Sequence, residues 1–350
     1  MSEELFIETD ERSEYDLLFT EGDEGKRIDA AIAERLPQIS RSRAQYLIEE
    51  GFITLNGGAS TPLKSRRIKP GDVVHITDPV SVALRAEPED IALTVVYEDD
   101  DLMVIEKPKG LVVHPAPGNE TGTLVNALLY RAREDNRKPP LTDGADQHSL
   151  RPGIVHRIDK NTSGLLVTAK TAFAHVELAR QFSEHSIERE YAAIAVGRFK
   201  DDEGVINVPT GRDPADRKKQ RALDVRRDGS LAAIHAADGE LPHGFRRAVT
   251  RWRVEELIGD YALLALRLET GRTHQIRVHL AHIGRPVLGD DLYGPARMVE
   301  SNRRKGESQY LHARTLGFAH PRTGEYMEFT SLLPEHFEKK LETLRKAVRA

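Results

Sequence analysis

Apolar residues recur at helical spacing in the N-terminal part of the chain. The pattern predicts helices over residues 28–36 and 41–50. Short apolar runs at residues 52–55 and 73–76 then predict two strands, separated by turn-rich sequence. Together these elements predict a small α+β unit over residues 25–80.

The pattern changes after residues 81–92, which we interpret as a linker. Short apolar runs at residues 94–97 and 102–105 flank an acidic turn and predict a β-hairpin. Downstream, strands and helices interleave irregularly, which favours an α+β domain with a mixed, largely antiparallel sheet over residues 93–350. The other predicted elements are an apolar strand in GLVVHP, a helix opened by Thr123, a buried strand at 165–169, a helix at 171–185, strands at 191–196, 252–254 and 261–268, a hairpin region at 212–249, and helices at 273–283 and 333–349.

Composition narrows the class of protein. The 350 residues are 39% hydrophobic and 31% charged, which is ordinary for a globular protein. The chain has no cysteine, which excludes disulfides, thiolate metal sites and a thiol nucleophile. No apolar run has the length of a membrane span, and the start of the chain is acidic, so we expect a cytoplasmic protein without a membrane anchor.

The net charge of −5 conceals an uneven distribution. The first 25 residues hold ten acidic side chains and one basic side chain, so the rest of the chain is mildly basic. We predict that residues 1–24 form an acidic, flexible leader. A weaker hypothesis is that this leader competes with nucleic acid for a basic surface.

One short stretch, HRIDKNTSGLLVTAK, combines charge with a buried strand. Asp159 lies between Arg157 and Lys160, in a loop directly before the apolar run, and nearby cations favour its ionised form. The Ser-Gly pair that follows lets another backbone or a ligand approach closely. An ionised carboxylate at this position is either a surface salt-bridge partner or a catalytic group, and this stretch alone leaves both open.

A second stretch, GRTHQIRVHLAHIGRPVLGDDLYG, offers a basic helix with Thr273 as its cap. Its three histidines suggest zinc, but their spacing does not match a known zinc motif and no acid lies between them. We therefore favour a different role for this helix, in which Arg277 faces Asp159 and forms an ion pair with it.

These stretches carry a family resemblance. HRIDKNTSGLLVTAK resembles the HRLDxxTSGLL signature of the RluA-type pseudouridine synthases, and EREYAAIAVG and GRTHQIRVHLAHIGRPVLGDDLYG resemble that family's other two motifs, in the same order. The resemblance covers roughly residues 95–329. Ile158 and Asn161 depart from the signature, and residues 212–249 match the family's hairpin only loosely.

The N-terminal unit resembles a second known module. SRSRAQYLIEEGFITLNG is similar to the alpha-L RNA-binding module, in which a helix and the following loop contact RNA backbone. Together with GLVVHPAPGN, it makes the chain most similar to the D-type members of the family, which modify a hairpin of large-subunit ribosomal RNA. The resemblance therefore implies an RNA substrate. We expect the protein to act as a monomer.

The resemblance also implies a reaction and its residues. Uridine is isomerised to pseudouridine after the nucleotide is flipped out of its stack, without metal or cofactor. The residues that match the family's functional positions are Asp159 as the essential acid, Arg277 as its partner, Tyr191 as the ring stacked on uracil, Arg157 as the residue that enters the RNA, His156 in a structural role, Leu165 and Leu166 as the pocket wall, and Arg41, Arg43 and Lys64 as RNA-backbone contacts.

Three other functions were weighed. A non-catalytic RNA-binding protein would explain the N-terminal unit, but not the combination of Asp159, Tyr191 and Arg277. A glycoside hydrolase also acts at an anomeric carbon, but it normally needs a second carboxylate. A metal-dependent nuclease needs clustered acids or histidines and would be sensitive to chelators.

Overall fold

The computed structural model describes residues 12–37, 39, 41–49, 51–57, 65–79, 86–115, 119–134, 153–216, 218–223, 241–242 and 244–349. The chain forms two compact units. One comprises residues 1–86 with 141–151, and the other comprises residues 87–140 with 152–350. Each unit is described by itself.

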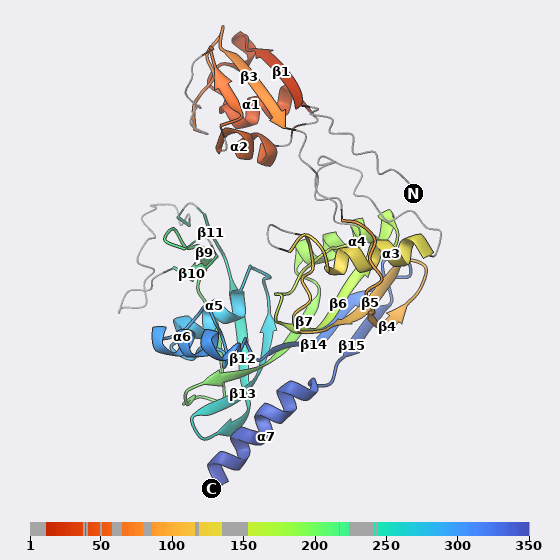
Figure 1. Ribbon diagram of the computed structural model, residues 1–350, viewed down its shortest axis with the longest axis vertical. Coiled ribbons are helices and arrows are strands. Elements are labelled where there is room, and N and C mark those ends of the chain that lie inside the picture. Colours follow the sequence, from red (N-terminus) through yellow and green to blue (C-terminus); the bar gives the residue numbers. More distant parts are fainter. Residues whose placement is uncertain are drawn as a thin grey trace, which may run out of the picture. The chain divides into compact units, whose positions relative to one another are not determined.

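The N-terminal unit is a three-stranded antiparallel sheet with two helices (Figure 1). Its strands and helices are β1 (Arg12–Leu18), α1 (Ile28–Arg35), α2 (Arg41–Glu49), β2 (Ile53–Leu55) and β3 (Val73–Pro79), with the sheet order β1-β3-β2. Apolar residues predicted to line one helix face, including Ile28 and Ile32, are fully buried against Ile53 and Val74. The two predicted helices and two predicted strands of this unit are therefore confirmed.

The predicted acidic leader over residues 1–24 is wrong from residue 12 onward. β1 pairs with β3 over its whole length, and Phe19, which follows it, is 1% exposed in the core of the unit. Tyr15 and Leu17 pack against this core, while the acidic Glu14 and Asp16 alternate with them on the other side of the strand. The acidic residues are thus the solvent face of a half-buried strand, a pattern that the charge count concealed.

The larger unit is built on a nine-stranded sheet with the order β4-β5-β6-β14-β7-β13-β12-β8, in which β15 pairs with β14 (Figure 1). β6 and β14 run parallel and the other pairs are antiparallel, so the predicted α+β fold with a mixed, largely antiparallel sheet is confirmed. The strands are β4 (Thr94–Glu98), β5 (Leu102–Lys107), β6 (Ser163–Ala169), β7 (Glu188–Val196), β8 (Glu203–Asn207), β12 (Val249–Ile258), β13 (Tyr261–Leu268), β14 (Leu311–Ala319) and β15 (Tyr326–Thr330).

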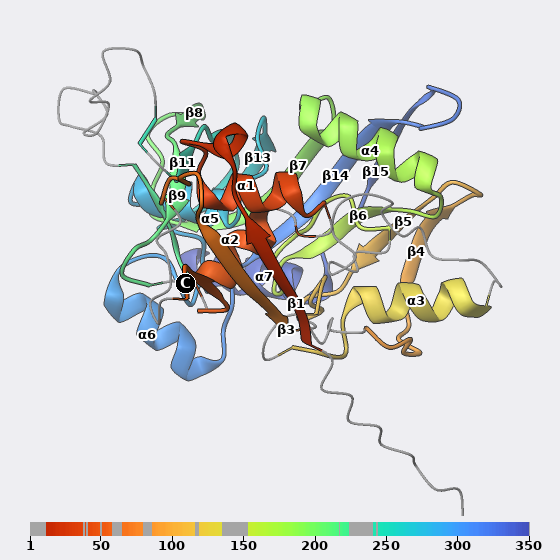
Figure 2. The same cartoon turned by 90° about the horizontal axis from the view of Figure 1, so that it is seen from above.

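Helices cover both faces of this sheet. The helices are α3 (Leu124–Glu134), α4 (Ala172–Glu184), α5 (Gln275–His282), α6 (Ala296–Lys305) and α7 (Glu335–Arg349). Figures 1 and 2 show α3 and α4 at the β4–β6 end, and α5 and α6 at the β12–β13 end. Phe337 and Leu341 of α7 pack against Ala192 and Ile194 of β7. Because strand residues alternate between faces, Tyr191 lies on the face of β7 that α7 does not cover.

Two predictions of the larger unit need correction. The GLVVHP segment forms no strand: in the described residues 111–115 only an isolated bridge joins Val112 to Thr123. Part of the predicted hairpin region at 212–249 forms a small second sheet of β9 (Thr210–Arg212), β10 (Gln220–Ala222) and β11 (Phe245–Arg246), in the order β10-β9-β11. Residues 224–240 of that region lie outside the described residues.

Candidate active site

The loop that carries Asp159 is fixed by its own backbone and by β6. The backbone N–H of Thr162 donates to the carbonyl of Asp159 at 3.1 Å, which closes a tight turn. Gly164, the second residue of β6, has φ of +111° and lies so close to β14 that a Cβ there would collide with the backbone of Ala313. The side chain of Asp159 keeps 20% of its surface exposed, so the carboxylate is partly accessible from solvent.

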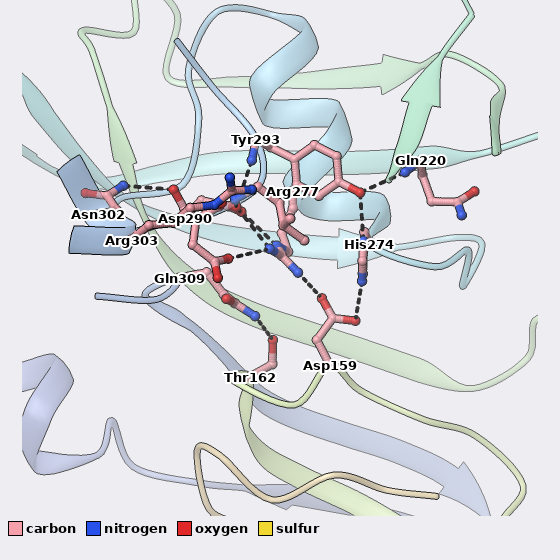
Figure 3. Close-up of polar contacts among 12 residues, drawn as sticks. Asp159, Thr162, Gln220, His274, Arg277, Asp290, Tyr293, Asn302, Arg303 and Gln309 are labelled. Atoms are coloured by element: carbon pink, nitrogen blue, oxygen red, sulfur yellow. Dashed lines mark hydrogen bonds and ion pairs between the residues drawn. The ribbon is translucent and has the colours of Figure 1, made fainter. Parts of the chain in front are cut away.

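Arg277 of α5 reaches this carboxylate. Its Nη1 donates to Oδ2 of Asp159 at 3.0 Å, and its side chain is only 4% exposed (Figure 3). The ion pair predicted between these two residues, which are 118 positions apart, is therefore present in the structure. A charge-assisted hydrogen bond in such a buried setting fixes the rotamer of the carboxylate.

Asp290 is a second partner of Arg277 and was missed in the sequence. Its carboxylate accepts from Nε of Arg277 at 2.7 Å and from Nη2 at 3.0 Å, and it is completely buried (Figure 3). The backbone N–H groups of Leu292 and Tyr293 also donate to it, at 2.8 and 2.9 Å. Burial lowers the pKa of Arg277, but the carboxylates of Asp290 and Asp159 outweigh it and raise the pKa above the usual value. The guanidinium is thus a fixed cation.

His274 and Tyr293 complete the surroundings of Asp159. The Tyr293 hydroxyl lies 2.7 Å from Nδ1 of His274 and accepts a hydrogen bond from the backbone N–H of Gln220 in β10 at 2.9 Å (Figure 3). The Tyr293 hydroxyl can donate its own proton to Nδ1 of His274, and in that tautomer the ring carries a proton on Nε2. That nitrogen faces Oδ1 of Asp159 at 3.8 Å. The Tyr293 ring also stacks on Arg277, with 5.1 Å between the guanidinium carbon and the ring centroid.

The backbone at His274 departs from the predicted helix start. α5 begins at Gln275, and the N-cap is His274 in a left-handed conformation with φ of +55°, not Thr273. A left-handed histidine is uncommon and marks a locally strained backbone. Burial lowers the pKa of His274, Asp159 raises it and Arg277 lowers it, with a net lowering, so the ring is neutral at pH 7.

Tyr191 of β7 is the third residue predicted for catalysis. It is 8% exposed, and burial raises its pKa; Arg189 opposes this shift and Asp159 adds to it. The phenol is therefore protonated at neutral pH, and both charged groups act on it. Tyr191 shares one face of β7 with Arg189, and this face is the one away from α7.

A comparison with known proteins identifies the family. The model of the RNA pseudouridylate synthase family matches residues 101–282, which is about half of the chain and includes Asp159, Tyr191 and Arg277. The chain belongs to this family. It is accordingly an RNA pseudouridine synthase, an isomerase that acts on RNA, and the resemblance to the RluA-type enzymes is confirmed.

Relatives match over nearly the full length. An uncharacterized RNA pseudouridine synthase, YlyB of Bacillus subtilis, is 41% identical, and the match covers 95% of this chain and 99% of the relative. The ribosomal large subunit pseudouridine synthase D of Haemophilus influenzae is 41% identical, with 92% of each chain covered. The solved structure of human RNA pseudouridylate synthase domain containing 4 has a TM-score of 0.55 at 24% identity, and it covers 72% of this chain and 93% of the human chain. That likeness supports the fold.

The remaining predicted residues of this synthase have different surroundings. Nε2 of His156 accepts from the backbone N–H of Val167 at 3.0 Å, and its ring stacks on Phe182 with 4.3 Å between centroids. Burial, with the charge of Arg189, lowers the pKa of His156 to about 3, so the ring is neutral, in keeping with the structural role predicted for it. Arg157 is exposed beside Asp159.

The predicted pocket wall stays a prediction. Leu165 packs in the core beneath α4 with Leu178 and Phe318, and is 2% exposed. Leu166, its neighbour along the strand, is directed to the opposite face of β6 and is fully buried. Both side chains are therefore part of the core that follows the Asp159 loop.

In the N-terminal unit, Arg41 is 55% exposed and its Nε donates to the buried Asp29 at 3.2 Å. Arg41 therefore neutralises a buried carboxylate of this unit, while part of its guanidinium stays accessible to solvent. The side chain of Arg43 and all of Lys64 lie outside the described residues.

Lys107 is a buried cation beside the loop of Asp159, and its role was not predicted from the sequence. Its Nζ donates to the carbonyls of Pro108, Leu111 and Lys160 at 2.9, 2.9 and 3.0 Å, and its side chain is fully buried. Burial lowers the pKa of Lys107 to about 7, and Asp159 opposes the shift. Since Lys160 follows Asp159 directly, this side chain ties the catalytic loop to the end of β5.

His279 of α5 is engaged in two hydrogen bonds. His279 is buried, with Nδ1 2.9 Å from the Thr250 hydroxyl and Nε2 2.9 Å from the carbonyl of Val208. Within the described parts of the chain, no group of three or more metal-ligating side chains is placed to hold an ion. Over the same residues, no helix is long and apolar enough to span a membrane.

Proposed function

We propose that this synthase isomerises specific uridines of large-subunit ribosomal RNA, with Asp159 as the essential acid and a flipped nucleotide as the reacting species. Relatives named ribosomal large subunit pseudouridine synthase D, from Haemophilus influenzae and Pasteurella multocida, match 92% of this chain at 40–41% identity and support the substrate. The observation that carries the assignment of the acid is the Asp159–Arg277 pair, in which Oδ2 accepts a hydrogen bond from Arg277 and Oδ1 faces His274 at 3.8 Å.

The reaction needs few groups. The bond between uracil N1 and the sugar C1′ breaks, the base turns, and C5 forms a bond to C1′. The proton on C5 then leaves, and N1 acquires one. Nothing is oxidised and no group is imported, so the chemistry itself calls for no cofactor. One carboxylate suffices, either as a nucleophile at the sugar or as a base that deprotonates it, and both roles start from the ionised form.

The geometry favours Oδ1 of Asp159 as the reacting oxygen. Oδ2 is held by Arg277, whose own position is set by the two hydrogen bonds to Asp290. Oδ1 faces His274 at 3.8 Å, and the exposed fraction of the side chain leaves room for a sugar. A carboxylate held in this way is oriented before substrate binds, which lowers the entropic cost of reaching the transition state.

Tyr191 supplies the surface for the base. Its ring lies on the face of β7 away from α7 and offers an aromatic surface on which the flipped uracil stacks. Because burial raises the pKa of the phenol and keeps it protonated, its hydroxyl would act as a relay, accepting the proton that C5 loses while it releases its own proton to water. Stacking offsets part of the cost of removing the nucleotide from its helix.

Arg157 and the N-terminal unit act on the RNA rather than on the uracil. Arg157 is exposed beside Asp159 and occupies the stack that the flipped base leaves. The accessible guanidinium of Arg41, together with Arg43 and Lys64, contacts RNA backbone, which adds affinity with little base selectivity. We infer that the enzyme works as a monomer.

The test is a map of pseudouridine after reaction in vitro. Purified protein is incubated with unmodified large-subunit ribosomal RNA transcript, and carbodiimide adducts are located by primer-extension stops. Stops at a small set of uridines, absent without protein, are expected. A transcript that binds the protein and remains unmodified would show that another RNA is the substrate.

A further inference from the structure

Arg189 is a half-buried cation that the proposed mechanism does not use. It lies on β7, two residues before Tyr191 and on the same face, and its side chain is half-buried. Its Nε is shielded from solvent and has no hydrogen-bond partner. Among the described residues, its ring contact is with Phe182, 5.6 Å from the guanidinium carbon, and no carboxylate lies within ion-pair distance.

A guanidinium at position 189 without a counter-ion lowers the stability of the free enzyme. A desolvated charge without a counter-ion destabilises a fold, and other buried arginines of this unit avoid the cost: Arg277 has Asp290, and Arg314 has Glu190 and Glu255. Burial lowers the pKa of Arg189, and Tyr191 opposes the shift; the guanidinium nevertheless stays protonated, because its pKa starts so high. A group that remains charged and unpaired in the free enzyme is available to an anion.

The surroundings of Arg189 are positive, and a glycine packs directly against its guanidinium. Gly271, in the loop before α5, lies against the guanidinium, and a Cβ at this position would come within 2.5 Å of Nη1. The next residue, Arg272, is half-buried and uses its Nε on the carbonyl of Arg247. The pKa of His185 is lowered by burial first and then by the charges of Arg189, Arg272 and Arg247, which places these three arginines in one neighbourhood.

We propose that Arg189, with Arg272 beside it, forms a phosphate-binding site that takes the backbone phosphodiester next to the flipped uridine. The site rests on the proposed function, because the anion is a phosphate of the bound RNA. Two residues along a strand span roughly 7 Å, which is comparable to the distance between a base and its own phosphate. Tyr191 would therefore hold the base while Arg189 holds the backbone of the same nucleotide.

The first experiment measures binding of large-subunit ribosomal RNA transcript at several salt concentrations. The enzymes compared are the wild type, Arg189→Met, Arg189→Lys and a control, Arg198→Met, which removes a cation that is 75% exposed and paired with Asp260. For Arg189→Met we expect affinity to fall about ten- to a hundredfold and the salt slope to drop by about 0.7 to 0.9. Arg189→Lys keeps part of the affinity, and Arg198→Met keeps all of it.

Thermal unfolding separates a ligand site from a structural arginine. Methionine fills a similar volume without a charge, so the melting temperature of Arg189→Met stays the same or rises. A lowered melting temperature with an unchanged salt slope would mean that Arg189 serves the fold, which overturns the proposal.

The second experiment locates the phosphate. Synthetic hairpins that contain the modified uridine carry a neutral methylphosphonate at one position at a time. One position adjacent to the uridine weakens binding of the wild type about tenfold or more and has no effect on Arg189→Met. Equal losses in both proteins, or a flat profile with the wild type, contradict the site. If the wild type forms no pseudouridine, the proposed function fails, and the salt slopes still decide whether Arg189 binds RNA.

Discussion

Replacing Arg277 with methionine separates the two tasks assigned to this residue. Arg277 holds Asp159, which serves catalysis, and it neutralises Asp290, which is completely buried. The substitution Arg277→Met removes the hydrogen bonds to Asp159 and Asp290, of 2.7 to 3.0 Å, and a longer one to Asp291 at 3.5 Å, and leaves these carboxylates without their cation. We expect a loss of both stability and activity.

The size of the stability loss follows from burial. Removing one partner of a buried ion pair costs about 3–5 kcal/mol, mainly because the remaining charge is left uncompensated. In a unit of this size each kcal/mol lowers the melting temperature by roughly 2–4 °C, so the expected decrease is roughly 6–20 °C. A second substitution, Asp290→Asn, removes the stranded charge, and its amide oxygen still accepts from the backbone N–H groups of Leu292 and Tyr293. The double variant should therefore regain most of the stability without regaining activity.

The chain contains a natural fluorescence probe of unfolding. Trp252, the single tryptophan, lies on β12, so its fluorescence reports unfolding of the unit that contains the site. Activity is followed by tritium released from RNA labelled at C5 of uridine. A double variant no more stable than Arg277→Met would refute the account of Asp290. Recovery of activity in the double variant would refute the role of Arg277 at Asp159.

Two further predictions concern the surroundings of the site. Tyr293→Phe removes the hydroxyl that can fix the proton of His274 on Nε2; turnover should fall about tenfold with RNA affinity unchanged, and equal losses in both would point to a general structural defect. Burial lowers the pKa of His279 and of His312 to about 4, whereas in the unfolded chain both titrate near 6.5. Between these two pKa values the unfolded chain binds more protons than the folded chain. The contribution of each histidine to the free energy of unfolding is therefore complete above pH 6.5. It falls by up to roughly 1.4 kcal/mol for each pH unit as the pH decreases toward 4. Denaturant unfolding at pH 7.5 and pH 5 measures this, and His312→Asn should show a smaller difference between the two.

The elements that were predicted correctly are those set by interactions between residues close in the sequence. The helical spacing in the N-terminal unit, the hairpin of β4 and β5 and the buried strand β6 all follow from periodicities within a few residues. The pairing of Asp159 with Arg277 was also predicted, because a family resemblance supplied the long-range information that the residues alone do not contain.

The missed features depend on contacts between distant segments. Asp290 and Tyr293 stand in a loop that resembles an ordinary turn, and only the folded chain brings them to Arg277 and to the backbone of Gln220. The resemblance implied that Leu165 lines the pocket, but it did not give the contacts of this side chain with Leu178 of α4 and Phe318 of β14. β1 was missed because its acidic residues outweighed the alternation of its apolar ones.

The most direct test of the central claim is single-turnover isomerisation by Asp159→Asn. The amide keeps the shape of the side chain and removes its charge, so the variant should bind large-subunit ribosomal RNA with wild-type affinity and release no tritium above background. Turnover near the wild-type rate, with the same uridines modified, would show that Asp159 is not the essential acid and that the roles assigned to Arg277 and Asp290 must be withdrawn.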